Sequence, residues 1–116
     1  MIQIRKDQMD AFSKVRYQDF ERRMTQHLRK FFPDKMRQMA EDEVKAFIRR
    51  CMEKAKRYDL VSEQSVAYFS HLPMLLGEDF ERSRRYRFAI AVLRAPAGAP
   101  EERVKVAMLL AHQLKL

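Results

Sequence analysis

The side chains with the widest range of chemistry are three histidines and one cysteine. His27, His71 and His112 each lack a second histidine, a cysteine or a carboxylate three or four residues away. That spacing is what places two metal ligands on one helix face, so no metal site is predicted. We expect His27 to be a core or boundary residue and His112 to be exposed to solvent. Cys51 lies within an apolar stripe, where a thiol packs as a small hydrophobic group and is a poor nucleophile.

Three carboxylates follow Gly77, namely Glu78, Asp79 and Glu81. Their spacing is not that of a calcium-binding loop, and four arginines follow closely, so we expect ion pairing within the chain or simple solvation. No serine lies in a nucleophile elbow, and the two glycines exclude a phosphate-binding loop. The sequence therefore predicts a protein that is not an enzyme, with no catalytic, cofactor-binding or metal-ligating residue.

The periodicity of apolar residues predicts the helices that carry these side chains. Val44, Phe47, Ile48 and Cys51 follow the spacing of one helix face, while basic residues occupy the opposite face. Similar patterns predict helices over residues 6–32, 33–40, 41–58, 63–76, 83–94 and 100–114. Met74 falls off the apolar stripe of its helix and is expected to be exposed. The predicted fold is all-α, a compact bundle of five to six helices that forms a single domain over residues 1–116.

Composition and hydropathy indicate the cellular location of the protein. The chain has 116 residues and one cysteine, which excludes an intrachain disulfide. No apolar run approaches the ~20 residues that a membrane span needs, and the first residues lack the apolar core of a signal peptide. We therefore expect no membrane insertion and a cytoplasmic location.

Three stretches of sequence together carry a resemblance to a known group of proteins. They are residues 4–9 (IRKDQM), residues 29–33 (RKFFP), and the segment that runs from Arg57-Tyr58 to Asp79-Phe80. With them the chain resembles a group of small, all-helical bacterial proteins encoded beside type VI secretion effectors, most closely the accessory co-chaperones. The resemblance implies a non-enzymatic co-chaperone or adaptor that binds such an effector or its dedicated chaperone.

Positive charge is unevenly distributed along the chain. The net charge is +8, and residues 1–58 hold 16 Lys and Arg against 9 Asp and Glu. Arg16, Arg23 and Lys30 recur every seven residues and form a row along their helix, while Arg49 and Arg50 lie on the outer face of the helix predicted over residues 41–58. If the two faces adjoin, they form one positive surface suited to an acidic protein or to phosphates.

Two other functions are compatible with this charge. A nucleic-acid-binding helical module would use the same basic surface, although most aromatic residues fall on predicted inner faces, where bases cannot stack on them. An immunity protein that blocks a toxin is the third class, and the positive net charge argues against a nuclease as the toxin. Lysine and arginine also serve simply as the solvated side of amphipathic helices.

The helix predicted over residues 100–114 is apolar on two sides. One side is formed by Val104, Ala107, Met108, Ala111 and Leu114. The second side is formed by Val106, Leu109, Leu110 and Leu116. Such a helix is either central in its domain or buries its second side against a second copy, as in a homodimer, or against a larger partner. The predicted protein-binding residues are therefore Val106, Leu109 and Leu110, together with the five basic residues named above.

Overall fold

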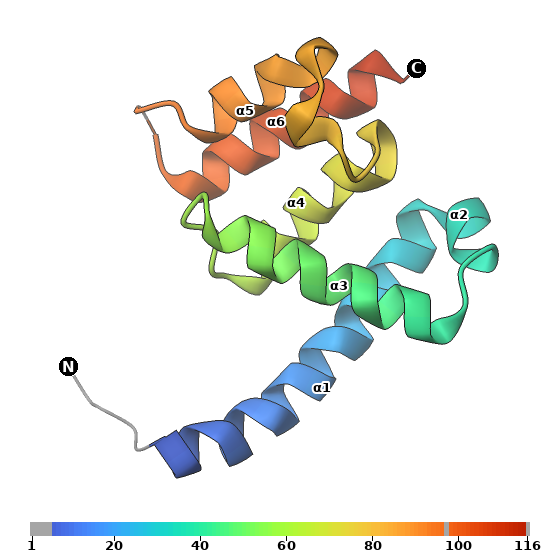
Figure 1. The fold of residues 1–116 in the computed structure, drawn as a ribbon, viewed down its shortest axis with the longest axis vertical. Helices are drawn as coiled ribbons and strands as arrows, with labels where there is room; N and C mark the ends of the chain where they lie inside the picture. Colours follow the sequence, from blue (N-terminus) through green and yellow to red (C-terminus); the bar gives the residue numbers. More distant parts are fainter. Residues whose placement is uncertain (1–5, 97, 116) are drawn as a thin grey trace. The chain divides into compact units, whose positions relative to one another are not determined.

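The computed structural model describes the backbone of residues 6–96 and 98–115, and within these ranges the side chains from residue 16 onward. These residues form six α-helices, labelled in Figure 1: α1 (Lys6–Phe31), α2 (Pro33–Arg37), α3 (Glu41–Lys56), α4 (Glu63–Leu76), α5 (Arg87–Leu93) and α6 (Pro100–Leu114). Two short 3-10 helices, η1 (Phe80–Arg82) and η2 (Arg84–Tyr86), lie between α4 and α5. No strand occurs in the described residues, so the prediction of an all-α fold is confirmed.

The chain divides into two compact units, one ending at Lys45 and the other beginning at Ala46. The first unit contains α1, α2 and the first turn of α3. The second unit contains the rest of α3 together with α4, α5 and α6. A single domain over residues 1–116 stays a prediction.

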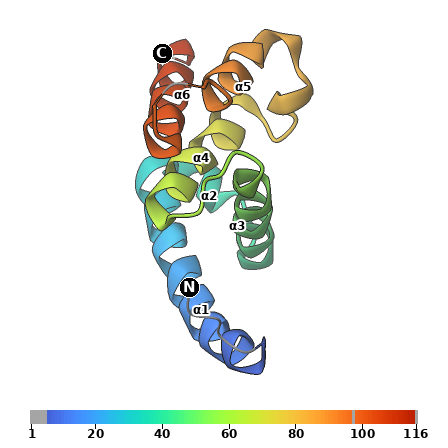
Figure 2. The same ribbon diagram turned by 90° about the vertical axis from the view of Figure 1, so that its left-hand side faces the viewer.

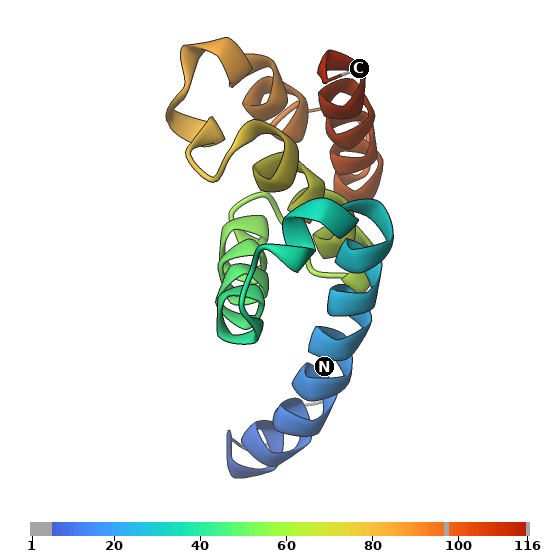
Figure 3. The same cartoon turned by 90° about the vertical axis from the view of Figure 1, so that its right-hand side faces the viewer.

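In the first unit, α2 packs against α1 (Figure 3). The break between them lies at Phe32, whose backbone leaves the helical region with φ −133° and ψ 58° because Pro33 follows it. Pro33 then begins α2, where its missing N–H costs no hydrogen bond. Met36 is the buried residue of this short helix.

In the second unit, α6 packs against both α4 and α5 (Figure 2). The residues that α6 buries are Val104, Ala107, Met108 and Ala111. The two alanines are fully buried and let neighbouring helices approach closely. From α4, Phe69 and Leu72 are also fully buried. This packing fixes which side of α6 faces inward.

Side-chain and backbone chemistry sets the ends of α4. Ser62 accepts a hydrogen bond from the backbone N–H of Ser65, and the Ser65 hydroxyl accepts one from the Ser62 N–H in return. This reciprocal cap satisfies two N–H groups at the start of the helix. Gly77 ends the helix with φ 96° and ψ 153°, a conformation that essentially only glycine adopts.

The structure corrects two predictions in this region. The helix predicted over residues 83–94 begins at Arg87, because Ser83 is extended and residues 84–86 form a 3-10 turn. Met74 is buried, although it lies off the main stripe of α4. In this helix Ser70 and His71 are buried as well, so α4 is enclosed on more than one side and a single apolar stripe does not describe it.

Candidate functional site

The outer face of α6 is apolar and exposed. Val106 is 47% exposed, Leu109 54%, Leu110 37% and Leu114 57%. These four side chains are called the α6 outer face below. Val106, Leu109 and Leu110 thus lie together where the sequence placed them, on the side opposite the buried stripe. Leu114 was predicted to belong to the inner stripe and is instead exposed, because it follows the last buried position, Ala111, at the end of the helix.

A shallow groove continues this face toward α5. It has a volume of about 410 Å³ and is lined by Phe88, Leu110, Gln113 and Leu114. Gln113 supplies the polar side chain of this lining, and the other three residues are apolar. Phe88 comes from α5, which packs beside α6, so the groove exists only because the two helices are in contact.

Basic side chains stand at one end of this groove. The guanidinium carbon of Arg85 and the Nζ of Lys115 each lie 5.9 Å from the centre of the Tyr86 ring. The Tyr86 ring in turn contacts Phe88 edge to face, with 6.5 Å between ring centres. A continuous set of contacts therefore joins two cations to an apolar wall of the groove, and cations at such ring distances are attracted to the π face.

The predicted basic residues are exposed, and they belong to different units. Arg16, Arg23 and Lys30 lie on α1, and Arg49 and Arg50 on the part of α3 within the second unit. Lys30 places its Nζ 5.5 Å from the centre of the Phe31 ring. Arg50 forms an ion pair with Glu78. Arg49 and Arg50 are adjacent on α3, and the three α1 residues follow one another at steps of seven along their own helix.

Glu78 and Glu81, two of the three carboxylates after Gly77, form ion pairs, one of the two roles expected for this group. Glu78 Oε1 accepts a hydrogen bond from Arg50 Nε at 2.8 Å, and the Glu78 carbonyl accepts one from Lys54 Nζ at 3.0 Å. Glu81 accepts a hydrogen bond from the Tyr58 hydroxyl at 2.6 Å and lies 3.7 Å from Lys54 Nζ. Their partners thus come from α3 and its C-terminal end. No cluster of three or more potential metal ligands occurs among the described residues.

Burial controls the chemistry of Cys51 and His27. Removal from water, and secondarily the nearby Glu78 carboxylate, raises the pKa of the Cys51 thiol to about 12. The prediction that Cys51 is buried is confirmed. Burial, followed by the charge of Lys30, lowers the pKa of His27, whose ring packs against Phe31 with 4.7 Å between centres. His27 is half-buried, as expected of a boundary histidine.

The other two histidines contact each other, which the sequence analysis missed. His71 Nδ1 lies 2.7 Å from His112 Nε2, and this hydrogen bond links α4 to α6. The prediction of an exposed His112 is wrong, because its ring packs on the buried His71. A hydrogen bond between two imidazole nitrogens requires that one ring donate and the other accept. The separation of 41 residues leaves no signal in local periodicity.

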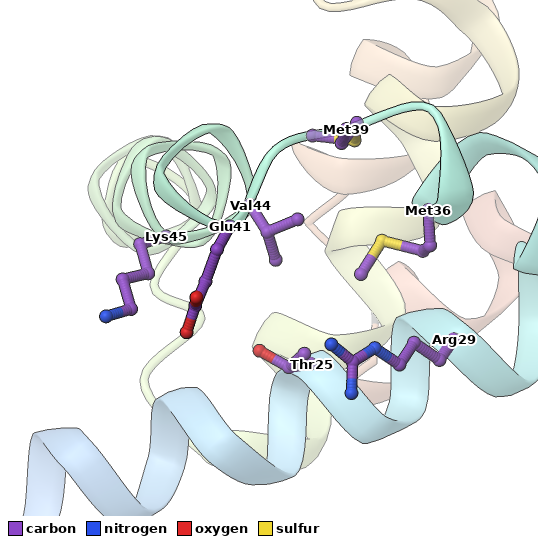
Figure 4. Close-up of a pocket in the computed structure, with 7 residues that line it drawn as sticks. All are labelled: Thr25, Arg29, Met36, Met39, Glu41, Val44 and Lys45. Atoms are coloured by element: carbon purple, nitrogen blue, oxygen red, sulfur yellow. The ribbon is translucent and has the colours of Figure 1, made fainter.

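A second pocket lies within the first unit and was also missed. Figure 4 shows its lining of Thr25, Arg29, Met36, Met39, Glu41, Val44 and Lys45, with a volume of about 240 Å³. The Thr25 hydroxyl donates to the Glu21 carbonyl at 2.8 Å, and Lys45 points away from Arg29 in this view. Met36 and Val44 are buried, whereas Arg29, Glu41 and Lys45 are exposed. The pocket therefore combines an apolar wall with charges of both signs.

Comparison of the chain with family models, with curated proteins and with solved structures finds no match. Within residues 6–96 and 98–115, no helix combines the length and hydropathy that crossing a bilayer requires.

Proposed function

We propose that this protein is a non-enzymatic binding module that docks another protein on the α6 outer face. The observation that carries the proposal is the exposure of three leucines and a valine on one side of a helix whose other side is fully used in packing. Covering these side chains stabilises a complex by about 1 kcal/mol each at ~25 cal/mol per Å². Contiguous exposed apolar side chains of this kind mark interaction sites on soluble proteins.

The resemblance to type VI secretion accessory proteins supports a secretion effector, or the effector's chaperone, as the partner. The protein is then a co-chaperone or adaptor that holds an effector, or the effector's chaperone, in the cytoplasm before secretion. The basic residues Arg16, Arg23 and Lys30, with Arg49 and Arg50, steer an acidic partner toward the protein by long-range attraction.

Nucleic-acid binding receives less support from the side chains. Among the described aromatic side chains only Phe31 is exposed, at 47%. Proteins that hold single strands stack successive bases on exposed rings, and the described surface offers one such ring. The scarcity of exposed rings therefore favours a protein partner over a single-stranded nucleic acid.

The test combines Leu109→Asp with Leu110→Asp in the tagged protein expressed in its native host. We expect the double variant to keep its helical circular dichroism and to lose the protein that co-purifies with the wild type, as read by mass spectrometry. The matched control is Val61→Asp, because Val61 is an apolar residue that is 84% exposed and lies outside α6. It should retain the partner.

A folded double variant that still retrieves the same protein would refute the proposal. If the double variant unfolds, Leu109→Ser alone replaces it, since Leu109 is more than half exposed and its loss removes little packing. Binding of the purified partner, measured by calorimetry, then decides the question. Undiminished affinity of Leu109→Ser would count against the outer face as the docking site.

A further inference from the structure

We infer that the partner segment that docks on the α6 outer face is an acidic amphipathic helix, with its apolar side chains inserted in the groove between α5 and α6. This inference rests on the proposed function and names the chemistry of the partner.

The shape of the surface matches a helix. After Lys105, the exposed residues of α6 recur at steps of three and four, at positions 106, 109, 110, 113 and 114, and so follow the helix axis for more than two turns. Charged residues, Glu101, Glu102 and Lys105, are exposed nearer the start of the helix. A second helix laid alongside presents side chains at the same repeat, which fit between those of α6. Phe88 extends the surface sideways to α5 and gives the groove its second wall.

Other ways of binding a peptide find little support here. Adding a strand requires an exposed sheet edge, and residues 6–96 and 98–115 contain no strand. Binding an extended proline-rich segment requires a groove lined by several aromatic rings, and Phe88 is the one aromatic residue that lines this groove. A helix laid in an apolar groove is the mode that fits this surface.

The charges that border the groove select an acidic segment. Arg85 and Lys115 flank Tyr86, which contacts Phe88, and Arg84 and Arg87 are exposed in the same turn. Residues 82–100 contain no acidic side chain. Carboxylates placed beside the apolar residues of a docked helix therefore meet cations on this side, and each such contact favours the acidic segment over a basic one.

A second copy of this chain is the main competing occupant. In an antiparallel arrangement, Glu101 and Glu102 at the start of one α6 would approach Lys115 at the end of the other. A net charge of +8 on each copy nevertheless opposes association of two copies. The observations therefore favour an acidic partner of different sequence.

The test uses two synthetic peptides of roughly 18 residues, long enough to form a helix on binding. Both carry the same leucine face, and the flanking positions are glutamate in one and lysine in the other. Fluorescence anisotropy with the intact protein should show at least about tenfold tighter binding of the glutamate peptide, with a preference that shrinks as salt is added. Leu110→Asp combined with Leu114→Asp should abolish binding of both peptides.

A charge reversal makes the test specific. Arg85→Glu with Lys115→Glu should reverse the preference toward the lysine peptide. The control Lys56→Glu with Arg57→Glu changes the net charge equally at two exposed positions away from the groove, and should keep the original preference. Equal reversal in both variants would mean that net charge alone selects the peptide, and this would overturn the inference.

The remaining outcomes separate this inference from the proposed function. Equal binding of the two peptides, or binding of neither, would overturn the inference that the partner segment is an acidic helix. The proposed function would still stand if co-purification of the native partner requires Leu109 and Leu110. Loss of peptide binding without loss of the native partner in the same variants would instead refute the docking site. Sedimentation that shows a dimer, abolished by Leu110→Asp, would identify a second copy as the occupant and overturn the inference.

Discussion

Helices α3 and α6 are nearly equal in length, at 16 and 15 residues, and differ in what their outer faces present. In α3, Phe47, Ile48 and Cys51 are buried while Arg49 and Arg50 are exposed. The outer face of α6 is exposed as well, but its side chains are leucine and valine. The exposed guanidinium groups of α3 are polar, and that of Arg50 already pairs with Glu78, whereas the apolar face of α6 gains free energy when another surface covers it. The outer face of α6, and not that of α3, is therefore the one suited to docking another surface.

The largest effect expected from this comparison is on folding. Phe47→Asp places a charge where the phenylalanine side chain is 3% exposed, and should lower the free energy of unfolding by more than about 3 kcal/mol. Leu109→Asp, at a residue that is 54% exposed, should change it by less than about 0.5 kcal/mol. Urea titration followed by circular dichroism measures both. Similar losses in the two variants would mean that the outer face of α6 contributes to the core.

Alkaline pH should lower the stability of the fold through two buried groups, Cys51 in α3 and Tyr58 just after it, and the outer face of α6 should play no part in this loss. Burial raises the pKa of Cys51 from 9.0 to about 12, and burial followed by the hydrogen bond to Glu81 raises that of Tyr58 from 10.0 to about 12. The folded chain therefore keeps protons that the unfolded chain releases. This stability is fully present below pH 9 and declines as pH rises from about 9 toward 12.

Urea titrations between pH 8 and about 10.5 should show this decline. Cys51→Ala combined with Tyr58→Phe should flatten the pH dependence, because neither variant side chain titrates in this range. Leu109→Asp serves as the control and should keep the slope of the parent protein. An unchanged slope in the combined variant would show that other groups cause the alkaline loss.

A small effect that depends on salt is expected on the outer face of α3. Arg50→Ala removes the pair with Glu78, whose side chains are 47% and 46% exposed, and should cost no more than about 1 kcal/mol. The difference from the parent should shrink further in ~1 M salt, where attraction between exposed charges is screened. A loss that persists at high salt would instead indicate packing of the arginine stem.

Sequence periodicity predicted the parts of this protein that depend on one helix at a time. It predicted the start of α3 at Glu41 and both ends of α6, because acidic first turns, Pro100 and the apolar repeat are local signals. It also placed Val106, Leu109 and Leu110 on one side of α6, since helix geometry alone decides which residues share a face.

Features that need two segments in contact were missed. The sequence gives no sign that Phe88 of α5 would complete a groove with Leu110, or that Arg85 and Lys115 would meet at the same tyrosine ring. Buried Met74 belongs to the same class, because its burial comes from packing on a second side of α4. Tertiary contacts decide these positions, and periodicity within one helix does not contain them.

The hydrogen shared by His71 and His112 gives the protein an intrinsic spectroscopic reporter. His112 lies one turn from Leu109, so the bridge is anchored in the interior yet adjoins the surface proposed for docking. An imidazole hydrogen held between two rings resonates apart from ordinary amide signals. Its nuclear magnetic resonance line would register the arrival of a ligand on α6 without any added label.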